Sequence, residues 1–178
     1  YNASRDKGNL PFTCSTEDIA ISKSLGNHDE TNRSNTSELL TFRLALSCNA
    51  EYTNYFGGVP QALAAMNATM TRVNGVFEMD FAIHMNMVPN LNIIYTNAAT
   101  DPYTSMGQWN DQLQSTLTAN IGEANYDVGH MFGASGGGGN AGCIGCVCVN
   151  NQKGRGITSP ADGVPMGDNF DIDYVAHE

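Results

Sequence analysis

Residues 39–47 read Leu-Leu-Thr-Phe-Arg-Leu-Ala-Leu-Ser and are the first stretch of the chain with a regular pattern. Apolar side chains recur at every second position, as Phe42, Leu44 and Leu46 show. Side chains of a strand point alternately to opposite faces of a sheet, so this period predicts a half-buried strand. The preceding residues are polar and weakly periodic, and we interpret residues 1–38 as a linker or the end of a pro-segment.

Two later stretches carry the period of a helix instead. The first follows Gly57-Gly58, has Pro60 in its first turn and repeats apolar residues at steps of four and three from Val59 to Phe77. The second repeats apolar residues at steps of four from Trp109 to Ile121. Each pattern predicts a long helix with one apolar stripe.

Further strands are predicted at 81–87, 126–132 and 143–149, with a short extended run at 93–95. Residues 134–142 and 150–169 read as loops because they are rich in glycine. The alternation of strands and helices predicts that residues 39–178 form one α/β domain, with a mixed twisted sheet, two long helices and the start of a third.

Composition limits the choice of partners. The chain of 178 residues has 18 acidic against 8 basic side chains, and a net charge of -10 argues against binding to a nucleic-acid backbone. No apolar run is long enough to cross a membrane. Few lysines together with much Asn, Thr, Ser and Gly are typical of a secreted, extracellular protein.

The five cysteines are Cys14, Cys48, Cys143, Cys146 and Cys148. Three within six residues indicate either a disulfide-rich edge or a metal knuckle, and we favour disulfides because no histidine is suitably spaced around them. In a strand over 143–149, Cys146 and Cys148 would face the same way and would each pair with a separate cysteine.

The sequence ends in Asp-Ile-Asp-Tyr-Val-Ala-His-Glu, residues 171–178, which reads as the opening of an amphipathic helix. The dipeptide His177-Glu178 begins the zinc-binding pattern H-E-x-x-H. A bare His-Glu pair occurs by chance in many chains, so the residues before it must support the interpretation.

Those residues do resemble a family. Residues 126–132, Tyr-Asp-Val-Gly-His-Met-Phe, are followed by a glycine-rich loop and by Gly-Cys-Ile-Gly-Cys-Val-Cys at 142–148. With the approach to the His-Glu pair from Asp168, this order resembles the metzincin zinc metalloproteases of the reprolysin (adamalysin) type, in their secreted bacterial form. The resemblance implies the upper, N-terminal subdomain of that fold over 39–178, cut within the zinc helix.

The resemblance also implies roles for residues. His177 would be a zinc ligand, and Glu178 the general base that takes a proton from the attacking water. The strand that lines the substrate cleft would comprise Gly142, Cys143, Ile144, Gly145, Cys146 and Val147. The family's motif has three zinc histidines, of which this sequence contains one, so we expect the chain to be inactive alone.

Two further sites stay open at this point. Cys14 is a candidate latency thiol, because pro-segments of the resembled family often place a free cysteine on the zinc; a disulfide to Cys48 or to the 143–148 cluster is the alternative. Asp168, Asp171 and Asp173 would suit calcium. Acidic residues at a helix entry, favoured by its dipole, are the commoner explanation.

The sequence therefore predicts a secreted zinc metalloendopeptidase that hydrolyses internal bonds of protein substrates, with its own pro-segment as a second partner. The alternative is a non-catalytic, disulfide-braced domain that binds other proteins. A second histidine at the required spacing after Glu178 would favour the enzyme. His130 lies within a predicted strand and is expected to be a buried structural histidine.

Overall fold

The computed structural model describes residues 13–16 and 38–178. Five strands form one sheet in the order β2-β1-β3-β5-β4, and among them only β4 runs antiparallel to its neighbour. The predicted α/β domain with a mixed sheet is confirmed. The interpretation of residues 1–38 falls mostly outside the described residues. The strands span Leu40–Cys48 (β1), Ile83–Met87 (β2), Val128–Phe132 (β3), Gly138–Asn140 (β4) and Gly156–Ser159 (β5).

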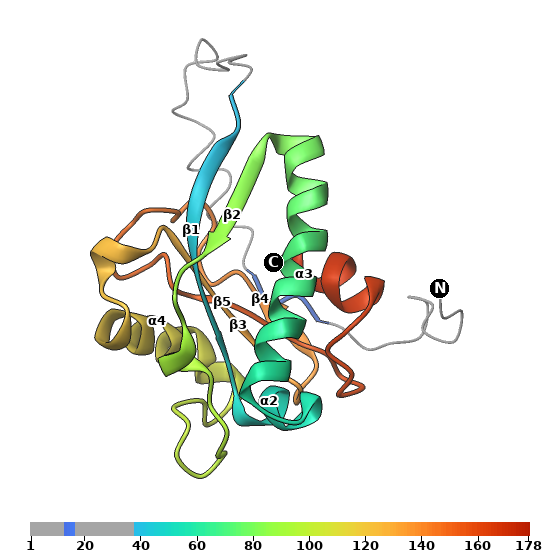
Figure 1. Cartoon of the computed structure of the whole chain (residues 1–178). Helices are drawn as coiled ribbons and strands as arrows, with labels where there is room; N and C mark the ends of the chain where they lie inside the picture. The colour runs from blue at the N-terminus through green and yellow to red at the C-terminus, as the bar shows by residue number, and fades with distance from the viewer. Residues whose placement is uncertain (1–12, 17–37) are drawn as a thin grey trace.

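Helices cover both faces of the sheet (Figure 1). The two long predicted helices are confirmed, with α3 and the C-terminal helix η7 on one face and α4 on the other. The helices are α2 (Ala50–Phe56), α3 (Val59–Phe81) and α4 (Trp109–Asn120), with the 3-10 turns η4 (Leu91–Ile93), η5 (Met106–Gln108) and η6 (Glu123–Asn125) and the π-helix η7 (Asn169–Val175).

The first strand is buried more completely than its alternating pattern predicts. Leu44 and Leu46 pack under α3 and η7, whereas Ala45, between them, packs under α4. Strands of a parallel sheet that carries helices on both faces are buried on both sides. The small side chains between the leucines therefore fill a second core rather than face water.

Four segments differ from the sequence-based expectation. Residues 143–149 form turns rather than a strand, with positive φ at Cys148. The two loops predicted at 134–142 and 150–169 instead contain β4 and β5. The extended run at 93–95 is the end of a 3-10 turn followed by an isolated bridge between Ile94 and Cys48.

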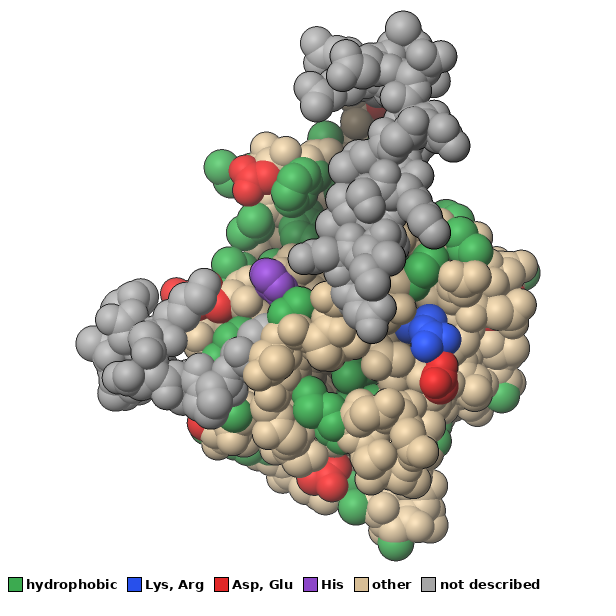
Figure 2. All heavy atoms as spheres, turned by 180° about the vertical axis from the view of Figure 1, so that it is seen from behind, with side chains coloured by type: hydrophobic (Ala, Val, Ile, Leu, Met, Phe, Trp, Pro, Cys, Tyr) green, Lys and Arg blue, Asp and Glu red, His purple; other side chains and the backbone are tan. Residues whose placement is uncertain are grey.

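The surface agrees with the acidic composition. On the face shown in Figure 2, basic side chains gather at one spot and acidic ones are scattered, so no broad basic patch is formed there. Of the helices described, none has the length and apolar character needed to cross a bilayer.

Gly129 on β3 provides a test of the packing between β3 and its neighbours. A Cβ there would contact the side chain of Leu117 on α4 and lie 2.7 Å from Gly154 Cα. Overpacking of this kind costs about 1–3 kcal/mol, so Gly129→Ala should lower the free energy of unfolding by that amount in urea titrations. The same change at the helical Gly75, where a Cβ meets nothing within 4 Å, should raise stability by about 0.5–1 kcal/mol. Equal effects of both variants would contradict the packing described.

His130 provides a test through pH. The ring is buried between β3 and β5, its Nε2 lies 2.8 Å from Thr158 Oγ1, and burial lowers its pKa from 6.5 to about 4. The unfolded chain therefore binds a proton between these two pH values that the folded chain does not. Stability should fall as the pH drops through this window, with a slope of up to about 1.4 kcal/mol per pH unit from this group. Urea titrations at several pH values should show a smaller slope for His130→Gln; identical slopes would contradict the assignment.

Candidate active site

The His177-Glu178 pair lies directly after η7, at the end of the sheet face that α3 covers. Phe170, Tyr174 and Val175 of η7 are buried against that face. The helix is wider than the expected α-helix, because the amide of Ala176 donates to the carbonyl of Asp171 five residues earlier. Helices of this π type are rare and are often found at functional sites.

Residues 13–16 lie along the free edge of β4 and pair with it as an added parallel strand. The amide of Gly139 donates to the carbonyl of Thr13 over 3.1 Å, and the amide of Ser15 donates to the carbonyl of Gly139 over 3.0 Å. The Asn140 side-chain amide also donates to the carbonyl oxygen of Ser15, at 3.0 Å. The edge of β4 thus binds an extended peptide by strand addition.

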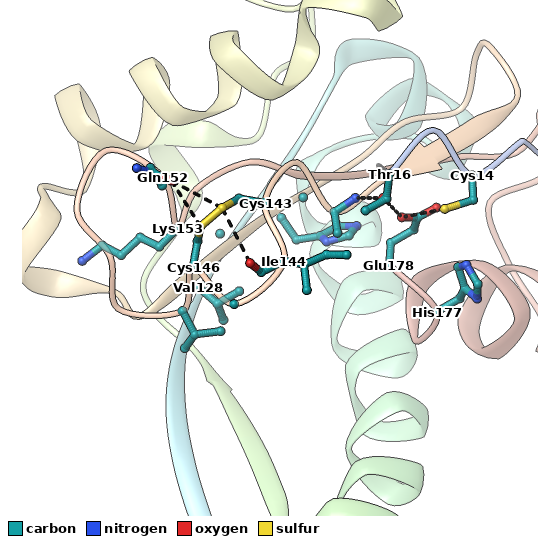
Figure 3. A pocket seen from close by; sticks show the side chains of 16 residues that line it. Cys14, Thr16, Val128, Cys143, Ile144, Cys146, Gln152, Lys153, His177 and Glu178 are labelled. Carbon is teal, nitrogen blue, oxygen red and sulfur yellow. Dashed lines mark hydrogen bonds between the residues drawn. A yellow bond between two sulfur atoms is a disulfide. The ribbon is translucent and has the colours of Figure 1, made fainter. Parts of the chain in front are cut away.

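This pairing brings Cys14 and Thr16 to the carboxylate of Glu178 (Figure 3). Thr16 Oγ1 donates to Glu178 Oε2 over 3.1 Å and accepts from the amide of Ala141 at 2.8 Å. Cys14 Sγ lies 3.8 Å from the same carboxylate oxygen. Burial raises the pKa of the Glu178 carboxyl above its usual value, although the hydrogen bonds from Cys14 and Thr16 oppose that shift. A carboxylate with a raised pKa is suited to act as a general base near neutral pH.

A metal ion fits between these side chains. The ligand atoms of Cys14, His177 and Glu178 all lie within 4.8 Å of one another, and no second such cluster occurs in the described part of the chain. Two ligands of one zinc ion are separated by a comparable distance, since each bond is about 2.0–2.3 Å long. Glu178 Oε1 is buried and receives no hydrogen bond from the described residues, so one oxygen of this cluster is left for a ligand or water.

Gly139 allows the carboxylate to approach the strand so closely. A Cβ on this residue would lie 2.6 Å from both Cγ and Cδ of Glu178. At the neighbouring Gly138 a Cβ would lie 2.6 Å from the carbonyl oxygen of Thr13. The glycines that made this segment read as a loop are therefore what the site requires.

The residues predicted to line the substrate cleft are placed differently from the expectation. The edge strand is β4, and the predicted segment forms the turns that follow it. Five of its six residues, all except Gly142, line a cavity of about 400 Å³ that also contains Cys14, His177 and Glu178. They therefore lie beside the His-Glu pair, but in a loop whose role in substrate binding stays a prediction.

The cysteines also differ in part from the expectation. Cys143 bonds to Cys146, while Cys14, Cys48 and Cys148 are free thiols. Cys146 thus bonds to a cysteine other than Cys148, as expected, whereas Cys148 has no disulfide partner among the described residues. Cys48 is buried beside Thr53, and burial raises the pKa of its thiol to about 11. It is therefore not available as the alternative partner of Cys14.

Two of the acidic residues before the His-Glu pair form ion pairs within the protein. Asp168 and Asp171 both contact the guanidinium of Arg72 on α3, so two of the three proposed calcium ligands are already paired within the protein. The calcium interpretation finds no support here.

Sequence reasoning missed three contributors to this site: Thr16, Asn140 and Gly139. Each is recognisable only once residues 13–16 are seen against β4, more than 120 residues away in the chain. The single sequence signal was the presence of two polar hydroxyl residues directly after Cys14.

Comparison with known proteins agrees with this geometry. The model of a family described as Metallo-peptidase family M12B Reprolysin-like matches residues 38–178. A search of curated proteins finds no match. The matched range runs from the start of β1 to the His-Glu pair and covers well over half of the sequence. The chain therefore belongs to the reprolysin-like metallopeptidases of family M12B.

Proposed function

We propose that this chain is part of a zinc-dependent endopeptidase that hydrolyses internal peptide bonds of proteins. The observation that supports this most directly is the arrangement of His177 and Glu178 beside an edge strand that already binds an extended peptide segment. Membership of the family alone would not show that the His-Glu pair lies beside an extended peptide segment. Because the sequence supplies one histidine ligand, we also propose that the remaining protein ligands come from residues outside it, and that the chain alone is inactive.

In this proposal Gly139, His177 and Glu178 have separate tasks. Main-chain groups of Gly139 hold the substrate backbone extended along β4. His177 binds the metal, which when present lowers the pKa of a water and polarises the scissile carbonyl. Glu178 takes a proton from the attacking water and passes it to the leaving amine.

We further propose that residues 13–16 keep the site latent. The thiol of Cys14 lies within 4.8 Å of the ligand atoms of His177 and Glu178, so it could bind the same metal ion, and a thiolate is a strong zinc ligand. Thr16 adds to this by bonding to the carboxylate that must accept a proton from water. A substrate would have to displace this segment from β4 before it could bind.

The disulfide and the absence of a membrane-crossing helix among the described residues are compatible with a secreted protein. Disulfides persist in oxidising compartments outside the cytosol. We propose this location together with protein substrates and the chain's own pro-segment as partners.

Glu178→Gln tests the catalytic proposal in the whole natural protein to which this chain belongs. The amide cannot accept the proton from water, so hydrolysis of a casein or quenched-peptide substrate should fall by about 10²–10⁴-fold. Zinc content measured by plasma emission should stay as in the wild type. The control is Glu51→Gln on α2, an exposed glutamate, which should keep full activity.

A Glu178→Gln protein that retains wild-type turnover would rule out the base. A whole protein that contains no zinc and cleaves no peptide would instead favour the non-catalytic binding domain.

A synthetic peptide of residues 11–18 tests the latency proposal. Added to the active protein freed of its own pro-segment, it should inhibit hydrolysis because it supplies both a metal-binding thiol and the Thr16 hydroxyl. Substitution of Cys14 by Ser in the peptide should remove most of the inhibition. Substitution of Thr16 by Val should weaken it about 5-fold or more, as expected for the loss of a hydrogen bond to a charged group. Equal inhibition by all three peptides would show that neither side chain contributes.

A further inference from the structure

The C-terminal helix η7 is bound to α3 by a buried carboxylate. Thr69 Oγ1 donates to Asp171 Oδ1 over 2.8 Å, and Arg72 Nε lies 3.1 Å from Asp171 Oδ2. Asp171 and Thr69 are 5% and 3% exposed, so the bond between them is shielded from water, whereas the side chain of Arg72 is 47% exposed. Arg72 also contacts Asp168 at the more exposed end of the same contact. We refer to Thr69, Arg72 and Asp171 as the Asp171 clamp.

Spacing explains why these residues meet. Thr69 and Arg72 are three residues apart on α3 and so lie on one face of that helix. This face is the one on which η7 packs (Figure 1). The two oxygens of a single carboxylate are thus held by two donors from adjacent turns, which restrains both the position and the orientation of Asp171.

The clamp is connected to the His-Glu pair through the main chain. The carbonyl of Asp171 accepts from the amide of Ala176, which directly precedes His177. The amide of Glu178 in turn donates to the carbonyl of Tyr174 over 3.1 Å. His177 follows Ala176 directly, so the position of its main chain changes with the rotation of the helix before it.

Apolar packing alone would not fix that rotation. Phe170, Tyr174 and Val175 hold η7 against the sheet, but hydrophobic contact is not directional and tolerates small rotations of a helix. A buried charge behaves differently, because leaving it without its partners costs several kcal/mol. Any rotation that separates Asp171 from Thr69 and Arg72 is therefore penalised far more than one that only repacks apolar side chains.

We propose that Thr69, Arg72 and Asp171 are positioning residues that set the rotation of η7, and thereby hold His177 and Glu178 toward Cys14 and the edge of β4. This inference rests on the proposed function of the His-Glu pair as ligand and base. None of the three touches the reacting atoms; they act through the helix. A buried carboxylate that is held by specific partners can select one arrangement of a helix among several.

The test uses Asp171→Asn, with Asp111→Asn as a matched control. Asp111 also pairs with an arginine, Arg155, at 2.7 Å, but on the exposed surface of α4. Two properties of the chain are measured at a temperature where circular dichroism shows it folded. One is the set of imidazole resonances of His177 in the metal-free protein, assigned with His177→Gln. The other is the affinity of the whole natural protein, which supplies the remaining ligands, for Co²⁺, with its thiolate charge-transfer absorption.

Asp171→Asn is expected to shift or broaden the His177 resonances and to weaken Co²⁺ binding by about 10–100-fold, as the loss of groups that orient metal ligands does. Asp111→Asn should leave both unchanged. A variant that only melts at lower temperature, with wild-type resonances and Co²⁺ affinity while folded, would overturn the proposal, because that result describes a purely structural ion pair.

If Asp171→Asn does not fold, Thr69→Val decides by the same two readouts, since it keeps the shape and the ion pair but removes one hydrogen bond. Its resonances and affinity should move in the same direction by a smaller amount, and wild-type values would overturn the proposal. Failure of the wild-type whole protein to bind Co²⁺ would count against the proposed metal site instead. The His177 resonances of the metal-free variants would still judge the clamp.

Discussion

Burial of the central strands on both faces is the constraint on which the remaining structure depends. β1 and β3 pack under α3 and η7 on one side and under α4 on the other, so neither can carry polar chemistry along its length. A buried polar group needs a hydrogen-bond partner, and His130 is accommodated in β3 only as a neutral ring bonded to Thr158. Functional polar groups are thereby confined to the edge of the sheet and to the turn after η7.

The edge strand that meets this turn has an unfavourable composition for a strand. Two of the three residues of β4 are glycine, which is depleted in strands because it loses the most conformational freedom on folding. β4 exists because β5 pairs with one of its edges and residues 13–16 with the other. A Cβ at Gly139 would lie 2.6 Å from Cγ and Cδ of Glu178, so a larger residue there would displace this carboxylate. Glycine thus lowers the stability of β4 but allows the Glu178 carboxylate to approach the strand.

Burial also explains which strands and helices the sequence could predict. β1, α3, α4 and β3 follow from periodicity, because each buries an apolar face that the pattern marks. β4 and β5 leave no such mark: one is mostly glycine, and the other is a four-residue strand buried throughout. The sequence predicts a strand over 143–149, because Cys146 and Cys148 alternate with Val147 and Val149. In fact, Gly142, Gly145 and Cys148 have positive φ and form turns.

For the site, the His-Glu pair could be recognised from its own residues, whereas its surroundings could not. Burial raises the pKa of Glu178, and a segment that precedes it by more than 160 residues opposes this shift through hydrogen bonds from one thiol and one hydroxyl. Two parts of the chain thus act on this carboxylate. The helix η7 sets its position, and residues 13–16 cover it and donate hydrogen bonds to it. Removal of residues 13–16 would expose Glu178 to water. The contacts of Thr69 and Arg72 with Asp171, which attach η7 to α3, do not involve these residues and would persist. The geometry of the base is therefore independent of latency, which allows the site to be fully formed before it is uncovered.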